Sequence, residues 1–210
     1  GTKATYLSGL QKKYGFEYLS FDYSGHGKSS GNINNCYFED WFYESLFIIK
    51  KKTSYPIIII GSSMGGWLAI LVAIHLNKKV KAIIGLATAA DFTTEMIRHL
   101  NIKNKITYLF KGIITYQSSY DHKPYFFSKA FIKNSKKFLL LNTKIKLNCK
   151  VALFYGELDN VVTLESQMKI LNLLTSRQAT LFISKNSNHR MSSKNDLANL
   201  EKQLIAFIST

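Results

Sequence analysis

The sequence contains little cysteine and little proline. Of its 210 residues, two are cysteines and two are prolines. Cys36 and Cys149 lie far apart and form no C-x-x-C pair, so they indicate neither a zinc site nor a disulfide framework and are typical of a reducing compartment. A content of 46% hydrophobic and 20% charged residues excludes disordered and collagen-like chains. We expect one globular domain with a substantial core.

Acidic residues and arginines are also scarce. There are 13 Asp and Glu residues against 28 Lys and Arg residues, which gives a net charge of +15, and only three of the basic residues are arginines. A protein that binds nucleic acid would be expected to gather arginines and aromatic residues on one face, whereas these lysines are scattered. We therefore expect no nucleic-acid partner. Most lysines are interpreted as solvated helix ends, and attraction to an anionic substrate or a membrane surface is the alternative.

Helical and strand-like patterns alternate along most of the chain. Helices are predicted over 2–14, 38–51, 64–76, 164–174 and 194–208, and strands over 18–22, 56–60, 81–87, 151–155 and 180–184. This alternation predicts an α/β fold in which helices flank a mostly parallel sheet. Residues 92–148 interrupt it and are rich in Lys, Phe and Tyr, so we interpret them as a helical cap insertion within a single domain over 1–210.

A run without Asp, Glu, Lys or Arg extends over 56–77 and is long enough to suggest a membrane span. Glycine and serine interrupt its middle at Gly61-Ser62-Ser63 and Gly65-Gly66. The run therefore predicts a buried strand followed by a buried helix, and we expect no stable membrane insertion.

The same run contains the motif G-x-S-x-G at Gly61–Gly65, between a predicted strand and a predicted helix. This spacing is typical of a tight turn whose flanking glycines avoid steric clashes and whose serine is exposed at the tip. Ser63 would then lie at a helix N-terminus, where the Met64 N–H can stabilise an oxyanion. The alternative is a glycine-rich turn that serves helix–sheet packing alone.

A serine nucleophile needs a histidine base that is oriented by a carboxylate. Asp159 follows the predicted strand 151–155, and His189 follows the predicted strand 180–184. Loops that follow parallel strands meet at one edge of the sheet, so Ser63, Asp159 and His189 are the predicted catalytic residues. Glu157 and Asp91 remain alternative acids.

The other histidines are given structural interpretations. His75 is expected in the core and His99 and His122 on the surface of the insertion, while His26 and Asp22 are expected to brace the sheet edge through a turn.

The residues Gly27-Lys28-Ser29 match the last three positions of the phosphate-binding motif G-x-x-x-x-G-K-S. The first glycine of that motif would fall at Asp22, and no helix is predicted after Ser29. A nucleotide site is therefore not predicted.

Several stretches resemble one superfamily. They are Phe21-Asp22-Tyr23-Ser24-Gly25-His26-Gly27, Gly61 to Trp67, Ile83 to Asp91 and Asn188-His189-Arg190-Met191. They are similar to the α/β hydrolases, and most closely to the branch that contains mitochondrial ABHD-type acyl-protein thioesterases and bacterial relatives. The resemblance implies an α/β-hydrolase fold and ester or thioester hydrolysis through an acyl-enzyme, with neither a metal nor an organic cofactor. It also implies Ser63 as nucleophile, Asp159 as acid, His189 as base and Met64 as an oxyanion donor.

Two departures from the family pattern accompany the resemblance. The acid loop, from Tyr155 to Thr163, lacks the His and Pro that relatives often carry. The family's first strands, and the loop with the second oxyanion N–H, would precede Gly1. We therefore expect a serine hydrolase acting on small or fatty acyl esters or thioesters, whose aromatic insertion forms the acyl pocket. The alternatives are a truncated non-catalytic remnant or binding module and a serine peptidase. A cytoplasmic location is expected, and the oligomeric state stays open.

Overall fold

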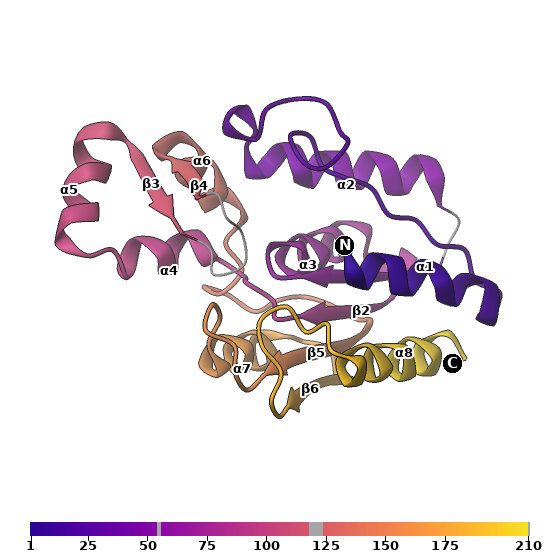
Figure 1. Ribbon diagram of the computed structural model, residues 1–210. Coiled ribbons are helices and arrows are strands. Elements are labelled where there is room, and N and C mark those ends of the chain that lie inside the picture. Colours follow the sequence, from indigo (N-terminus) through magenta and orange to yellow (C-terminus); the bar gives the residue numbers. More distant parts are fainter. Residues whose placement is uncertain (54–55, 118–123, 210) are drawn as a thin grey trace. The chain divides into compact units, whose positions relative to one another are not determined.

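The computed structural model describes residues 1–53, 56–117 and 124–209 (Figure 1). The chain forms two compact units. The first, here called the sheet unit, comprises Gly1–Phe21, Ile48–Ala90 and Leu140–Thr210, and the second unit comprises Asp22–Phe47 and Asp91–Leu139. The predicted insertion covered 92–148. The second unit differs from it, because it also includes Asp22–Phe47 and ends at Leu139. The assignment of a single domain over 1–210 stays a prediction.

The sheet unit is built on four parallel strands in the order β1-β2-β5-β6. The strands are β1 (Ile57–Ser62), β2 (Val80–Leu86), β5 (Lys150–Gly156) and β6 (Ala179–Ser184). The central strands β2 and β5 are almost entirely buried, which requires cover on both faces, whereas β1 and β6 are half-exposed. The predicted α/β architecture with a parallel sheet is confirmed.

One predicted strand does not form. Residues 18–22 belong to no strand, because a strand needs a hydrogen-bonded neighbour and no ladder in the described part of the chain includes them. A strand-like local pattern does not by itself supply a pairing partner.

Helix α3 (Met64–Leu76) packs against β1 and β2 and has the predicted bounds. It is apolar around its whole circumference, as expected of a helix buried on several sides, and Trp67 is fully buried. The uncharged run 56–77 is therefore a strand followed by a separate helix. Among the described residues, no helix combines the length and the apolar character that crossing a membrane requires.

Helices α7 (Leu164–Leu173) and α8 (Lys194–Ile208) complete the sheet unit with α1 (Thr2–Tyr14). α7 contacts β5 and β6, whereas α8 contacts β2 and lies beside α1 (Figure 1). Ser193 caps α8 through a reciprocal capping box with Asp196, and Gly15 ends α1 in the left-handed conformation.

The second unit contains the first part of α2 (Phe38–Lys52), together with α4 (Phe92–Arg98), α5 (Ile102–Lys111) and α6 (Lys129–Ser135). Its core is aromatic, with Phe38 against Phe138 and Trp41 against Phe131. The expected helices are present in the insertion, but so is an antiparallel pair that the sequence did not predict, β3 (Ile113–Tyr116) and β4 (Tyr125–Ser128). Strands of four residues are too short to give a clear alternating pattern.

A single carboxylate joins α1 to α8. Glu201 accepts hydrogen bonds from the Tyr6 hydroxyl, from the Tyr14 hydroxyl at 2.6 Å and from Lys13 Nζ at 2.8 Å. The hydrogen bonds from Lys13, Tyr14 and Tyr6 lower the pKa of Glu201 to about 2. The ionised form is therefore the one that holds α1 in place.

Replacing Glu201 by Gln should lower the free energy of unfolding at neutral pH and flatten its acid dependence. The pKa of Glu201 is depressed on folding, so its contribution is complete above the unfolded value of about 4.3 and is lost as the pH falls toward 2. Urea unfolding of both proteins at pH 7 and pH 3 measures this. The Glu17→Gln variant, with an exposed carboxylate, is the control. Equal wild-type and E201Q midpoints at pH 7 would contradict the assigned role.

Candidate active site

Ser63 occupies the turn between β1 and α3 in a conformation that few non-glycine residues adopt. Its φ is 54° and its ψ is −122°. Two hydrogen bonds fix its backbone to the neighbouring strand and loop: Ser63 N donates to Leu86 O at 2.9 Å, and Ala89 N donates to Ser63 O at 3.1 Å. Such strain is retained only where the surroundings enforce it, which is why an outlier at this position points to function.

The two glycines of the motif have different roles. A Cβ added to Gly61 would lie 2.1 Å from the carbonyl oxygen of Gly65, whereas a Cβ on Gly65 would have no atom within 4 Å. The turn is therefore tight at Gly61, where strand and helix backbones meet. The expectation that both flanking glycines avoid clashes is correct for Gly61 and wrong for Gly65, whose Cβ would point into open space.

The loops that follow β5 and β6 are tied together. Leu158 N donates to Ser187 O at 2.8 Å, and Glu157 N donates to Ser184 O at 3.0 Å. A Cβ on Gly156 would lie 2.4 Å from Ser187 O, so the two backbones approach as closely as glycine permits. These contacts fix the distance between the loop that carries an acid and the loop that carries a histidine.

The histidine loop is also anchored to α8. Ser187 Oγ donates to Asp196 Oδ1 at 2.5 Å, while the other oxygen of Asp196 accepts from Ser193 N at 2.9 Å. Asp196 is buried, with 4% of its surface exposed. One carboxylate thus caps the helix and holds the loop that precedes His189.

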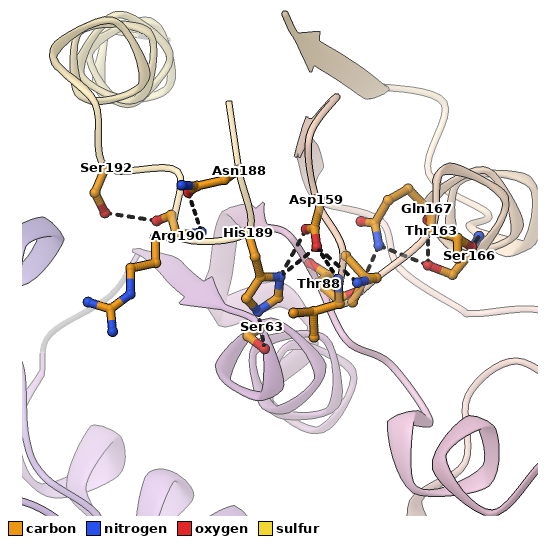
Figure 2. Close-up of polar contacts among 12 residues, drawn as sticks. Ser63, Thr88, Asp159, Thr163, Ser166, Gln167, Asn188, His189, Arg190 and Ser192 are labelled. Atoms are coloured by element: carbon orange, nitrogen blue, oxygen red, sulfur yellow. Dashed lines mark hydrogen bonds and ion pairs between the residues drawn. The ribbon is translucent and has the colours of Figure 1, made fainter. Parts of the chain in front are cut away.

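The structure brings Ser63, His189 and Asp159 into one hydrogen-bonded chain. His189 Nε2 lies 3.0 Å from Ser63 Oγ, and His189 Nδ1 lies 2.9 Å and 3.1 Å from the two carboxylate oxygens of Asp159. Figure 2 shows the imidazole between the two partners. The side chain of Asp159 is completely buried and that of His189 is 11% exposed.

Asp159 is held by its own loop. Its Oδ1 accepts hydrogen bonds from Val161 N at 2.8 Å and Val162 N at 3.0 Å. A buried carboxylate with backbone donors on one oxygen and an imidazole on both is fixed in orientation, and so it fixes the imidazole.

Met64 is the first residue of α3, directly after Ser63. The first amides of a helix have no intrahelical acceptor, and the helix dipole places positive potential at this end. The Met64 N–H therefore lies where helices commonly bind anions.

Two further residues support the turn, and the sequence did not identify them. Gln167 on α7 is fully buried and donates from Nε2 to Thr88 O at 2.7 Å (Figure 2). A Cβ on Gly66 would lie 2.6 Å from Thr88 Oγ1, so Thr88 packs directly against the start of α3. The Gln167 amide thus holds Thr88 in place. The next residue in that loop, Ala89, donates its backbone N–H to the carbonyl of Ser63. A lone buried glutamine has no sequence signature that would reveal this.

The alternative acids have other positions. Glu157 Oε2 accepts a hydrogen bond from Asn186 N at 3.2 Å and so braces the histidine loop. Asp91 is buried in the second unit, where it occupies the N-terminal cap position of α4. His189 Nδ1 is bound to Asp159 in this structure.

The remaining histidines are distributed as follows. His75 is exposed in the last turn of α3, so its expected place in the core is wrong; it lies with Ile74 on the solvent side of that turn, whereas Ala73 and Leu76 are buried. His99 is exposed on the surface of the insertion, as expected, 3.5 Å from Glu95. His122 lies outside the described residues.

Asp22 and His26 stabilise a turn within the second unit. Asp22 Oδ2 accepts from Lys28 N at 3.0 Å, and the ring of His26 packs edge-on against Trp41 with centroids 5.0 Å apart. Because the segment 18–22 is not a strand, these residues brace the turn itself and not a sheet edge. In the described part of the chain, no cluster of three or more His, Cys, Asp or Glu side chains could hold a metal ion.

Comparison with known proteins identifies the family. The family profile described as alpha/beta hydrolase fold matches residues 5–102. The chain is 34% identical over 198 residues to palmitoyl-protein thioesterase ABHD10, mitochondrial, from Bos taurus, covering 94% of this chain and 65% of that protein.

Two solved structures are similar over nearly the whole chain. Alpha/beta hydrolase domain-containing protein 10 from mouse has a TM-score of 0.92 and 32% identity, and covers 100% of this chain and 84% of that one. A protein from Agrobacterium vitis S4 has a TM-score of 0.93 and 27% identity, with coverage of 99% and 82%. The chain belongs to the α/β-hydrolase superfamily, near the ABHD-type thioesterases.

Substitution of the two motif glycines by Ala should have opposite effects on stability. G61A places a methyl group against backbone that cannot move away, and we expect a loss of about 1–3 kcal/mol or more. G65A adds a methyl group in open space within a helix, where Ala is favoured over Gly by about 1 kcal/mol. Urea denaturation of both variants measures the difference. Equal destabilisation by the two substitutions would contradict the asymmetry.

Proposed function

We propose that this protein is a serine hydrolase that cleaves carboxylic ester or thioester bonds through an acyl-enzyme, with Ser63 as nucleophile, His189 as general base and Asp159 as the orienting acid. The observation that carries the proposal is the unbroken chain of hydrogen bonds from Ser63 Oγ through the imidazole to a buried carboxylate. The fold does not require a serine, a histidine and an aspartate from three separate loops to form such a chain. Catalysis does require a nucleophile in contact with a base and a base in contact with a group that orients it.

In the first half of the reaction, Ser63 Oγ attacks the carbonyl carbon of the substrate while His189 Nε2 accepts the hydroxyl proton. The Asp159 carboxylate holds the proton on Nδ1, so that Nε2 is free to act as base, and stabilises the imidazolium that forms. The carbonyl oxygen becomes an oxyanion beside the Met64 N–H. The tetrahedral intermediate then collapses, the bond to the leaving alcohol or thiol breaks, and a proton from His189 accompanies the leaving group.

In the second half, a water molecule takes the place of the leaving group. His189 Nε2 accepts a proton from the water as its oxygen attacks the acyl carbon, and the same proton returns to Ser63 Oγ when the ester bond to the serine breaks. The products are a carboxylic acid and the free enzyme. None of these steps calls for a metal or an organic cofactor.

The names of the relatives support a proposal for the substrate class alongside the geometry. The bovine and mouse relatives belong to the ABHD10 type, and the bovine protein is named a palmitoyl-protein thioesterase. We propose an acyl thioester or ester as substrate for this chain as well, with a small leaving group or an acylated protein. The chain spans 65% of the length of the bovine relative, so its substrate is proposed from its own site and not taken from that name alone. A cytoplasmic location stays a prediction; the relative's name places that protein in mitochondria.

Replacing Ser63 by Ala should abolish labelling by a fluorophosphonate probe and reduce acyl thioester turnover by about 10⁶-fold, because the hydroxyl is the bond-forming group. Ser62→Ala is the matched control: the neighbouring serine ends β1, and its loss should leave both signals close to the wild type. Labelling that survives in S63A would contradict the assignment of the nucleophile. A wild-type chain that neither labels nor turns over substrate would favour a non-catalytic binding module.

Replacing Asp159 by Asn should lower kcat by about 10³–10⁴-fold without a comparable change in KM, because the amide stabilises the wrong imidazole tautomer. Glu157→Gln in the same loop tests the alternative acid. Its carboxylate contacts a backbone amide and not the imidazole, so a change of less than about tenfold is expected. A larger loss in E157Q than in D159N would assign the role to Glu157 instead.

A further inference from the structure

Helix α5 presents its apolar side chains to solvent. The exposed fraction is 78% for Ile102, 51% for Ile106, 69% for Leu109 and 87% for Phe110. At about 100° per residue, these four side chains fall within a single arc of about 100°. A surface helix of a globular protein ordinarily turns such an arc toward the core.

The opposite, polar side of α5 faces the protein. Asn104, Thr107 and Tyr108 are half-buried, and no residue of the helix is fully buried. The helix is nevertheless well formed, since the Asn101 side chain caps its first turn and Gly112 ends it in the left-handed conformation. Its orientation is thus reversed relative to an ordinary amphipathic helix, and its apolar arc is available for an external partner.

The antiparallel pair next to α5 also carries exposed apolar side chains. β3 contacts α5 and begins directly after Gly112 (Figure 1). The pairing of Ile113 with Ser128 and of Thr115 with Phe126 places Ile113 and Phe126 on the same face of the pair. Both are exposed, at 41% and 53%, whereas Ile114 on the other face is buried. Exposed apolar side chains gathered on neighbouring elements are typical of interaction sites.

The charges around the arc identify the partner. Lys105 borders it on one side and Lys103 on the other, both exposed, and α5 contains no acidic residue. Long lysine side chains beside an apolar face can keep their ammonium groups in water while their methylene stems cover apolar surface. A basic border around an apolar arc matches an anionic lipid surface, in which acyl chains lie below negatively charged headgroups.

We propose that α5 and the outer face of β3–β4 form a peripheral docking surface for anionic membranes, in which Ile102, Ile106, Leu109 and Phe110 enter the headgroup region and Lys103 and Lys105 contact lipid phosphates. The helix lies in the plane of the interface and does not cross it. This docking is separate from the hydrolytic chemistry, because none of these residues is among Ser63, Asp159 and His189.

Co-sedimentation of the full chain with phosphatidylcholine vesicles that contain about one third phosphatidylserine, at about 0.15 M salt, tests the proposal. Wild-type protein should bind these vesicles and bind pure phosphatidylcholine much less. Ile106→Ser combined with Phe110→Ser should weaken binding by about tenfold or more, and Phe110→Ser alone by several-fold. Ile183→Ser on β6, which removes a side chain that is 57% exposed outside the patch, should bind like the wild type.

The charge component is tested separately. Lys103→Gln with Lys105→Gln should reduce binding by about fivefold per lysine, whereas Lys50→Gln with Lys52→Gln, an exposed pair on α2, should reduce it less. Circular dichroism of each variant checks that the fold is kept.

Failure of the wild type to bind anionic vesicles, or equal binding by the wild type and I106S/F110S, overturns the proposal. If the wild type fails to bind vesicles and is a dimer that I106S/F110S converts to monomers, the face is a contact between copies of this chain and the membrane proposal is wrong.

Discussion

The common direction of β1, β2, β5 and β6 is the constraint on which the candidate site depends. Parallel strands end at one edge of a sheet, so the residues that follow them become neighbours whatever their distance in sequence. Ser63 follows β1, Thr88 follows β2, Asp159 follows β5 and His189 follows β6. A reversal of any one strand would send its loop to the opposite edge. The strand topology therefore brings these four loops together whatever side chains they carry.

Topology brings the loops to one edge, but it does not set distances to within a few tenths of an ångström. That precision comes from close backbone approach. Gly61 lies against the Gly65 carbonyl, and Gly156 lies against the Ser187 carbonyl. Where two backbones touch, there is no side chain whose rotamer could change their spacing, and the hydrogen bonds of Ser63 and Leu158 to neighbouring loops hold the register. The geometry between Ser63 and His189 is therefore fixed mostly by main chain.

The sequence predicted those parts of the structure in which a local pattern and the final environment agree. Helices α1, α3 and α8 have the predicted bounds, because α1 ends with Lys12, Lys13 and Gly15, α3 begins at the glycine–serine turn, and Ser193 caps α8. The segment 18–22 has a strand-like pattern but pairs with no strand among the described residues. The prediction for His75 was wrong because one side of the last turn of an apolar helix can face solvent while the other side is buried.

The positions of Asp159 and His189 just beyond strands were correctly predicted, because that inference needs only strand ends. The brace from Gln167 to Thr88 could not be predicted, since it depends on which face of α7 meets the loop. The outward orientation of the apolar side of α5 could not be predicted either, for a related reason. Periodicity shows that a helix has an apolar side, but it cannot show whether that side turns inward.

Asp196 couples two parts of the molecule that would otherwise be independent. One oxygen of its carboxylate completes the cap of α8 and the other holds Ser187. Proteins open locally in cooperative segments, and a segment is defined by the interactions that must break together. The first turn of α8 and the loop that carries His189 share such an interaction. A transient fraying of this helix end would therefore remove one of the contacts that hold the loop of His189, and the backbone hydrogen bonds to the loop of Asp159 would have to hold that loop in its place.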